Sequence, residues 1–521
     1  MGAWLLVPFS TFVTFTLKFI IFPYKPSHKL NAPLPPGPTT LPIIGNFIWL
    51  FKLASRGMDS ILRDLHAKYG SVVSVPVPFT HPVIMIADRS LAHQALVKNS
   101  AVFADRPEAR PSIKFMTSNQ QVAATAGYGP TWRLIRRNLI SEVMIPSKLK
   151  AYAGTRKWAL DDLVNRLGTA SSSGRNMVQV LDHLRMSVTG LFLYMCFGEK
   201  MEEEKVRETV DVQGRFLAGL VGEFKILNFG AAWFTKILFY KRWGRFFQIL
   251  QQQMDLLLPL IQTRKKIKEE GKWSSNRKEN DNNSNNIAFV DTLLGLELPE
   301  EKRTFDNAEL VNQCSDFVIA GFDTIVITLQ WMMANVVKHP HIQEKIVLEI
   351  KEVVGEVEEV KEDDLHKMKF LKAVVLEGLR RHPPGHFLLP HSVTEDVILD
   401  GRYAIPKDCT VNFSLAEMGR DPKVWAEPME FKPERFLSGE ENVCDITGSK
   451  DIKMMPFGVG RRMCPASSLS MVLLEYFVAN LVWKFEWRAV EGVGVDMSEK
   501  VETSWGMKNP LQAHITPRLN Y

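Results

Sequence analysis

Cysteine is scarce in this sequence: the 521 residues include five, at positions 196, 314, 409, 444 and 464, and no two of them form a CxxC pair. This scarcity excludes a disulfide scaffold and argues against zinc fingers and redox dithiols, which need closely spaced thiols. Long runs of like charge are also missing, and the formal net charge is only +6. Nucleic acid is therefore a poor candidate partner. Any special cysteine chemistry has to rest on a single sulfur.

Disorder is excluded as well, because 45% of the residues are apolar and 23% are charged. The length alone suggests about three domains, but no repeat or shift in composition marks a boundary. Helical periodicity prevails, for example over residues 58–69, 132–139, 150–167 and 246–268, and short strand-like runs occupy 71–77 and 82–87. We therefore predict one mainly α domain with a small β portion over residues 47–521. Its Asn/Ser-rich stretch, 274–286, is predicted to be a flexible surface loop.

The N-terminal segment is apolar from residue 3 to residue 23, which is about the length that crosses a hydrocarbon core. No basic residue precedes it and no small-x-small cleavage site follows, so an uncleaved anchor over residues 1–24 is favoured over a cleaved signal peptide. Lys25 and Lys29 then place the rest of the chain on the cytoplasmic side. Residues 25–46 contain L-P-P-G-P and predict a stiff neck, with an ordinary Pro-rich linker as the alternative.

A long apolar helical pattern runs from about residue 304 to 338 and is stopped by Pro340, which predicts a helix of about 50 Å. Its middle, residues 320–324, reads A-G-F-D-T. A glycine there costs about 1 kcal/mol relative to alanine, and an acid among apolar residues needs a partner. A close helix crossing at Gly321 with Asp323 capped locally accounts for both, and a functional site is the alternative.

Residues 455–465 read M-P-F-G-V-G-R-R-M-C-P and precede a helical pattern over 466–483. Cys464 therefore lies just before a helix N-terminus, where backbone amides favour the thiolate that binds metal. A small buried hydrophobic residue is the alternative interpretation. One thiolate cannot build a zinc tetrahedron, so a metal that another scaffold already holds is the better fit. Haem iron, with its porphyrin nitrogens, is such a metal.

The same loop carries a family signature, F-x-x-G-x-R-x-C, formed by Phe457, Gly460, Arg462 and Cys464. With it the sequence resembles the cytochrome P-450 family of haem-thiolate monooxygenases. Further motifs of that family follow in order: W-x-x-x-R at 132–136, A-G-x-D-T at 320–324, E-x-x-R at 377–380 and P-E-R-F at 433–436. The anchor, the Pro-rich neck, F-A-D-R-P at 103–107 and F-K-P-E-R-F at 431–436 resemble plant microsomal A-type members. The resemblance spans nearly the whole chain and implies that haem lies between a long central helix and the cysteine loop.

The resemblance also implies residue roles around haem b. Cys464 would be the axial ligand of the iron. The other cofactor contacts would be Phe457 and Gly460 beneath the haem, Arg462, Trp132, Arg136 and the candidate His391 at the propionates, and Ala320 and Gly321 above the iron. Arg137 and Arg461 are expected to face solvent.

Two further groups of residues receive roles in the same way. Thr324 and Asp323 would deliver protons during oxygen activation. Glu377, Arg380 and Arg435 would form a structural cluster of buried charges. Three positions depart from the family pattern, namely Phe322, Ile325 and Ala466. None removes an essential group, but they are expected to make the pocket more apolar and to weaken its proton supply.

The function implied is an NADPH-dependent monooxygenase that inserts one atom of O2 into a lipophilic small molecule, in plant specialised or catabolic metabolism. Residues 458–460 are too short for a G-x-G-x-x-G fingerprint, so electrons are expected from an NADPH–haemoprotein reductase at the endoplasmic reticulum membrane. Substrate contacts are expected from the apolar segments 115–126, 214–229, 311–319, 386–389 and 503–507. The alternatives are a haem-thiolate isomerase or lyase that needs no reductase, and a non-catalytic membrane haemoprotein.

Overall fold

The structure is a computed structural model and describes residues 32–38, 57–77, 81–172, 177–228, 232–270, 288–356, 359–437, 445–501 and 504–518. The chain forms two compact units. The first takes the described residues up to Pro107, then His386–Trp425 and Asp445–Met463, and the second takes the remainder. The predicted anchor over 1–24, most of the neck and the loop over 274–286 lie outside the described residues. The single-domain assignment over 47–521 stays a prediction.

The first unit is built on a four-stranded sheet in the order β1-β2-β7-β4. Strands β1 and β2 are antiparallel and correspond to the two predicted strand-like runs, whereas β2 and β7 are parallel. Ile61, Leu62 and Leu65 of α3 cover one face of the sheet. The bounds are α3 Met58–Tyr69, β1 Val72–Val75, β2 Val83–Ile86, α4 Arg89–His93, η1 Gln94–Lys98, β4 His391–Ser392, β5 Val397–Leu399, β6 Tyr403–Ile405, β7 Thr410–Phe413, α17 Leu415–Gly419 and η6 Gly460–Arg462.

The described piece of the neck lies along strands of this unit. The carbonyl of Pro36 accepts a hydrogen bond from the amide of Ser74 at 2.9 Å, and that of Pro33 accepts one from Ala404 at 2.8 Å. A Cβ added to Gly37 would come within 2.1 Å of the Ser74 oxygen. This glycine therefore allows the neck to approach β1 at backbone distance.

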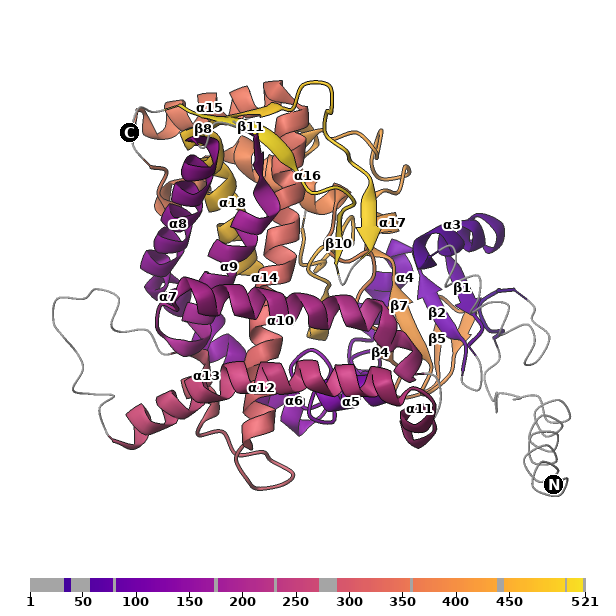
Figure 1. Cartoon of the computed structure of the whole chain (residues 1–521). Helices are drawn as coiled ribbons and strands as arrows, with labels where there is room; N and C mark the ends of the chain where they lie inside the picture. Colours follow the sequence, from indigo (N-terminus) through magenta and orange to yellow (C-terminus); the bar gives the residue numbers. More distant parts are fainter. Residues whose placement is uncertain are drawn as a thin grey trace, which may run out of the picture. The chain divides into compact units, whose positions relative to one another are not determined.

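The second unit is mostly helical (Figure 1). Its helices are α5 Pro111–Met116, α6 Pro130–Leu139, η2 Ile140–Met144, α7 Pro146–Ala151, α8 Ala153–Ser172, α9 Val180–Phe197, α10 Glu203–Val221, η3 Glu223–Asn228, α11 Ala232–Leu238, α12 Tyr240–Glu269, α13 Phe289–Leu293, α14 Asn307–Lys338, α15 Pro340–Val354, η4 Glu362–Lys367, α16 Lys369–Arg381, η5 Pro433–Phe436 and α18 Ser467–Lys484. Its strands are β3 Met177–Gln179, β8 Phe485–Ala489, β9 Glu499–Val501, β10 Trp505–Met507 and β11 Gln512–Pro517. The prediction of a mainly α protein with a small β portion is confirmed.

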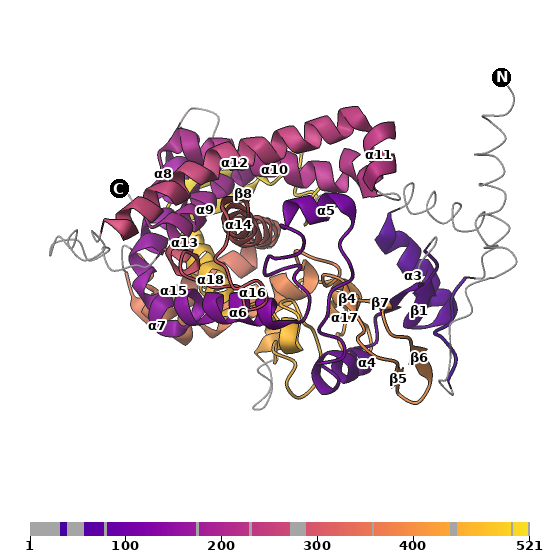
Figure 2. The same ribbon diagram turned by 90° about the horizontal axis from the view of Figure 1, so that it is seen from below.

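Helix α14 is the centre of the second unit, and α9, α12, α16 and α18 pack around it (Figure 2). It begins three residues later than predicted because Asp306 caps it. The Asp306 carboxylate accepts from the Glu309 amide at 2.8 Å, and Glu309 accepts from the Asp306 amide at 2.7 Å. Within the part of the chain that the structure describes, α14 is the one helix long and apolar enough to cross a membrane. It serves as a core helix instead, since 72% of its apolar window is buried in the protein.

Candidate functional site

A stripe of incompletely covered residues runs along the middle of α14. It comprises Asp316, Ile319, Ala320, Asp323 and Thr324, of which Ala320 is exposed and the other four are half-buried. Their spacing of three and four residues puts them on one face of the helix. Phe317 and Val318, which point elsewhere, are buried. We call this face the open stripe: protein atoms leave it uncovered in the middle of an otherwise buried helix, as a ligand site requires.

Gly321 lies at the edge of the open stripe and is needed for the packing of α14 on α9. A Cβ at this position would lie 2.2 Å from Cε1 of Phe192 on α9, far inside van der Waals contact. The close helix crossing expected from the sequence is therefore present. This packing explains why residue 321 is a glycine without reference to a cofactor.

The Asp323 carboxylate has a partner that the sequence did not reveal. Its Oδ2 accepts a hydrogen bond from Ser504 Oγ at 2.6 Å, although the two residues are 181 positions apart. This oxygen is thus held by the segment that leads into β10. The neighbouring Thr324 hydroxyl donates to the Ala320 carbonyl at 2.9 Å, one turn back along the helix.

Phe322 and Ile325, which depart from the family pattern, do not belong to the open stripe. Phe322 is 3% exposed and Ile325 is 4% exposed. Both point from α14 into packed protein because they lie one or two residues out of phase with the stripe. The expectation that they make a pocket more apolar is therefore wrong.

Cys464 lies three residues before α18, as its position before a helix N-terminus predicted. Among the described cysteines it is the one with partial exposure, since Cys196, Cys314 and Cys409 are buried. Burial raises the pKa of the Cys464 thiol, whereas the amide of Ala466 and the guanidinium of Arg136 lower it. Burial therefore outweighs these two groups, and a metal ion bound to the sulfur would favour the thiolate. A sulfur that is shielded from water and faces one amide and one guanidinium suits an axial ligand of haem iron.

Trp132 and Arg136 lie together on α6. The guanidinium carbon of Arg136 is 5.7 Å from the centroid of the Trp132 ring, and Trp132 is buried. Burial lowers the pKa of Arg136, and the nearby Cys464 raises it. Arg137, which follows, is exposed as expected. A sequestered guanidinium beside an indole is suited to a carboxylate ligand.

In the first unit, His391 lies close enough to Arg462 to feel the charge of its guanidinium group. Arg462 Nε donates to the Ala104 carbonyl at 2.6 Å, and Nδ1 of the buried His391 lies 2.6 Å from the Phe103 carbonyl. Burial lowers the pKa of His391 to about 3, helped by the guanidinium groups of Arg106 and Arg462. The ring is therefore neutral and donates from Nδ1, which leaves Nε2 an acceptor. His391 can therefore donate a hydrogen bond to a carboxylate at Nε2 only after a proton has been added to Nε2.

The glycines of the cysteine loop are required by its shape. Gly460 has φ of 72°, and a Cβ there would meet the Leu96 carbonyl oxygen at 1.9 Å. Gly458 also has a positive φ, 67°. A larger residue at Gly460 would push the loop away from η1, and one at Gly458 would be strained by its positive φ. Phe457 is half-buried in the same loop, and Arg461 is exposed as expected.

The predicted charge cluster is present where α16 contacts η5. It consists of Glu377, Arg380 and Arg435. Arg380 donates to both Glu377 oxygens, at 2.7 and 2.8 Å, and Arg435 Nε donates to Glu377 Oε1 at 3.2 Å. The Lys432 amide adds a hydrogen bond of 2.8 Å to the same oxygen. Glu377 is 0% exposed and Arg380 1%. This cluster fastens the segment around η5 to α16.

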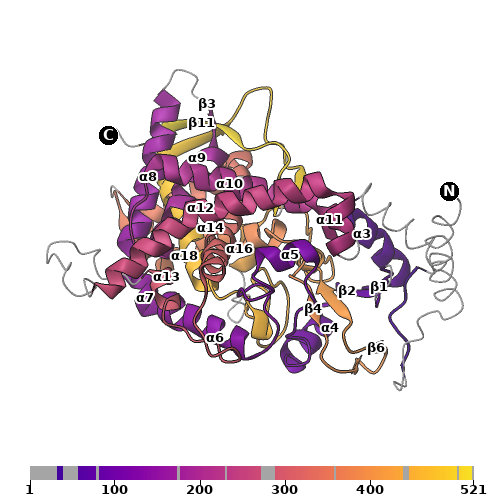
Figure 3. The same ribbon diagram turned by 60° about the horizontal axis from the view of Figure 1, so that its bottom comes forward.

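Apolar side chains of two predicted substrate segments pack beside the open stripe. The aromatic cluster consists of Phe216, Leu217, Phe224, Leu227, Trp243 and Phe246, and Ile319 of the stripe packs against it. Helices α5, α10 and α12, which carry or border the cluster, lie next to α14 in Figure 3. Trp243 and Phe246 on α12 lie outside every segment that was predicted to contact substrate.

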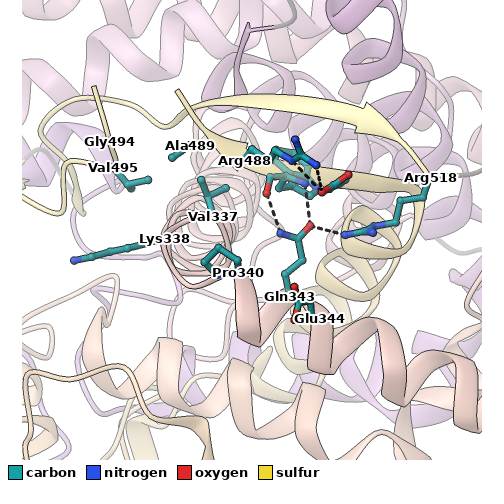
Figure 4. A pocket seen from close by; sticks show the side chains of 12 residues that line it. Val337, Lys338, Pro340, Gln343, Glu344, Arg488, Ala489, Gly494, Val495 and Arg518 are labelled. Carbon is teal, nitrogen blue, oxygen red and sulfur yellow. Dashed lines mark hydrogen bonds and ion pairs between the residues drawn. The ribbon is translucent and has the colours of Figure 1, made fainter. Parts of the chain in front are cut away.

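A separate pocket lies at the C-terminal end of α14, beside Val337 and Lys338 (Figure 4). Gln343 Oε1 accepts from Arg518 Nη2 at 2.9 Å there, and Arg488 pairs with Glu486. Thr324 is about 20 Å away along the helix at 1.5 Å per residue. No sequence motif falls in this pocket, and we do not assign it to the site.

Comparison with known proteins identifies the family. The model of the family described as Cytochrome P450 matches residues 35–515. Cytochrome P450 89A9 of Arabidopsis thaliana is 44% identical over 99% of this chain and 98% of its own length. Tabersonine/lochnericine 19-hydroxylase of Catharanthus roseus is 30% identical over 98% of this chain and 97% of its own length. A zebrafish cytochrome P450 solved with abiraterone has the same fold, with a TM-score of 0.71 at 20% identity over 88% of this chain and 99% of that one. The chain therefore belongs to the cytochrome P450 family of haem-thiolate monooxygenases, whose cofactor is haem b.

Proposed function

We propose that this protein is an NADPH-dependent, reductase-coupled monooxygenase of lipophilic small molecules. It inserts one oxygen atom of O2 into the substrate and reduces the other to water. The observation that carries the proposal is the open stripe of α14, which presents Asp323 and Thr324 beside the small Ala320. Relatives that are named hydroxylases, such as ent-cassadiene C11-alpha-hydroxylase 1 of rice at 30% identity, support the same reaction class.

We assign the residues that fit haem b by their roles. Cys464 would bind the iron, and Phe457 and Gly460 would shape the loop beneath it. Trp132, Arg136 and Arg462 would hold the propionates, joined by a protonated His391. Haem, when bound, supplies the iron at which O2 is activated. Ala320 would leave space for O2 on α14, and Gly321 would keep the helix close to its neighbours.

Protons for the reduction of O2 would pass through the hydroxyl of Thr324 and the carboxylate of Asp323. The Thr324 hydroxyl donates to its own helix at rest, so it has to turn away from the Ala320 carbonyl to donate elsewhere. Asp323 would take up and release the proton at its carboxylate, and Ser504 Oγ holds one oxygen of that group in place. General acid–base groups of this kind contribute typically 10²–10⁴-fold to rate.

The partner is proposed to be a flavin-containing NADPH–haemoprotein reductase, because the sequence contains no dinucleotide fingerprint. We further propose that an anchor over residues 1–24 holds both proteins at the endoplasmic reticulum membrane. The haem-thiolate isomerase or lyase and the non-catalytic haemoprotein are the rival functions. Asp323 and Thr324 favour the monooxygenase, since neither rival needs proton delivery to O2.

The test is incubation of membranes that contain the full chain and a reductase with a plant metabolite extract, NADPH and ¹⁸O2. A monooxygenase yields products with one labelled atom that need NADPH. Conversion without label or reductase would establish the isomerase or lyase, and bound haem with no conversion would favour the non-catalytic protein. Cys464→Ala is the matched control for the ligand and should lose the thiolate-type spectrum of the reduced carbon monoxide complex.

A further inference from the structure

The pocket at the C-terminal end of α14 takes no part in the proposed oxygen chemistry (Figure 4). Its volume is about 520 Å³, which falls within the ~300–1,000 Å³ typical of small-molecule sites. It lies between the junction of α14 with α15, strand β8, Val495 and Arg518, and we call it the end pocket. Thr324 is about 20 Å away along α14, so a molecule in the end pocket is not the substrate of the proposed oxidation.

The end pocket has an apolar lining where α14 meets β8. Val337 and Trp487 are almost fully buried, with exposed fractions of 2% and 1%. Pro340, Ala489 and Val495 continue this lining. A ligand that covers these side chains removes apolar surface from water, which is worth about 25 cal/mol per Å². The lining therefore favours a ligand with an apolar body.

Arg518 borders the end pocket and is held in place by the protein itself. Its Nε donates to the carbonyls of Val482 and Phe485 at 3.1 and 3.2 Å, and its Nη2 donates to Gln343 Oε1 at 2.9 Å. Gln343 is fixed in turn, because its Nε2 donates to the Trp487 carbonyl and its Oε1 accepts from the Trp487 amide, each at 2.9 Å. Ordering an arginine side chain costs about 1.5–2 kcal/mol, and here folding has already ordered it. The guanidinium is thus preorganised for a ligand.

The guanidinium of Arg518 still has unused donors. Of its five N–H groups, one at Nε and one at Nη2 make the hydrogen bonds above, and Nη1 makes none among the described residues. Capping of the two carbonyls at the end of α18 accounts for Nε, but it does not account for the edge formed by Nη1 and Nη2. That edge matches the two oxygens of a carboxylate.

The charged residues of the end pocket favour a monoanion. The lining contains three basic residues and two acids, Glu344 and Glu486, so its formal charge is +1. Arg488 donates to Glu486 Oε1 at 2.8 and 3.0 Å. Lys338 and Arg518 are the basic lining residues that form no ion pair within the described part of the chain. A dianion such as phosphate would meet two acids, whereas one carboxylate balances the net charge.

We propose that the end pocket binds a lipophilic carboxylate, whose two oxygens accept hydrogen bonds from Arg518 Nη1 and Nη2 and whose apolar body covers Val337 and Pro340. This inference goes beyond the proposed function and does not depend on it, because the end pocket is remote from the open stripe. The bound molecule is a second ligand of the protein, and it stabilises the folded chain by mass action.

The experiment measures binding at the end pocket while another ligand occupies the haem site. The full-length holoprotein is saturated with clotrimazole, an imidazole that ligates the iron, and is then titrated by calorimetry at pH 7.5. The probes are 4-(1-naphthyl)butanoate and its neutral amide. We expect one equivalent of the carboxylate to bind roughly tenfold more tightly than the amide, which corresponds to about 1.4 kcal/mol.

Arg518→Met removes the guanidinium, so the preference for the carboxylate should fall to within about twofold. Arg518→Lys keeps the charge without the planar edge and should restore only part of the preference. Lys345→Met is the matched control, because it removes the same charge from α15 at a residue outside the end pocket, and its preference should persist. Val495→Trp fills the end pocket and should weaken the binding of both probes roughly tenfold.

Three results would overturn the proposal: no saturable binding of the carboxylate, an undiminished preference in Arg518→Met, or an equal loss in Lys345→Met. Release of clotrimazole by the probe, followed by haem absorbance, would place the probe at the haem and would overturn it as well. If Arg518→Met does not retain haem, Val495→Trp decides instead, and unchanged affinities in that variant would refute the site. None of these results alters the outcome of the labelled-oxygen test of the proposed function.

Discussion

Ser504 Oγ donates a hydrogen bond of 2.6 Å to Asp323 Oδ2, and so joins the C-terminal segment before β10 to the middle of α14. Ser504 is 7% exposed, so water competes little for this contact. This hydrogen bond restricts the orientation of the carboxylate that is proposed to transfer protons. The serine is therefore a positioning residue for the proposed proton delivery.

Replacement of Ser504 by alanine should lower the amount of product formed per NADPH consumed by several-fold. It should also increase the release of hydrogen peroxide. The reason is that a released Asp323 carboxylate delivers protons in the wrong orientation. The measurement is product formed per NADPH consumed, together with the solvent isotope effect on that ratio. Ser504→Thr keeps the hydroxyl and should restore the ratio, and an unchanged ratio in Ser504→Ala would show that the contact is only structural.

Gly321→Ala should destabilise the protein by about 1–3 kcal/mol, the usual cost of overpacking a core. The added Cβ would lie 2.2 Å from the Phe192 ring, and α14 and α9 are packed against each other. Urea unfolding and haem retention measure the effect. The double variant with Phe192→Ala should recover part of the loss. Gly214→Ala on α10 is the control, because no atom lies within 4 Å of its new Cβ, and it should be neutral or stabilising by up to about 1 kcal/mol.

Glu377→Gln should cost about 3–5 kcal/mol and should lose haem without a change in ligand preference. The substitution leaves the buried guanidinium of Arg380 without its counter-charge. Haem content and thermal unfolding report the loss, and the ratio of two ligand affinities reports preference. Glu434→Gln breaks the exposed pair with Lys345 and is the control, with an expected cost below about 1 kcal/mol. A Glu377→Gln protein with full haem content and wild-type stability would refute the structural role.

Much of the fold and of the site follows from local sequence signals. The course of α14 and its end before Pro340 follow from its apolar periodicity, although its start was predicted three residues too early, and the position of Cys464 follows from the glycines and proline that flank it. The strands β1 and β2 and helix α3 also follow from local periodicity. These features depend on neighbours within a few residues, so one sequence is enough to predict them.

The parts that sequence reasoning missed depend on helix phase or on distant contacts. The buried positions of Phe322 and Ile325 follow from the phase of α14 relative to its neighbours, which no local pattern specifies. Ser504 had no local signal, because its partner is 181 residues away.

Glu475 on α18 should make stability depend on pH near neutrality. Burial raises the pKa of its carboxyl to about 7, with Lys372 as the one opposing charge. The unfolded chain ionises this group near 4.5, so the folded state loses relative stability as the pH rises from about 4.5 to 7, and the loss is complete above that range. Glu475→Gln removes the penalty and should stabilise the protein by about 1–2 kcal/mol at pH 8, with no gain at pH 4.5. Urea unfolding at both pH values, with the exposed Glu491→Gln as the control, measures the difference. An equal effect at the two pH values would mean that packing, and not ionisation, determines the change.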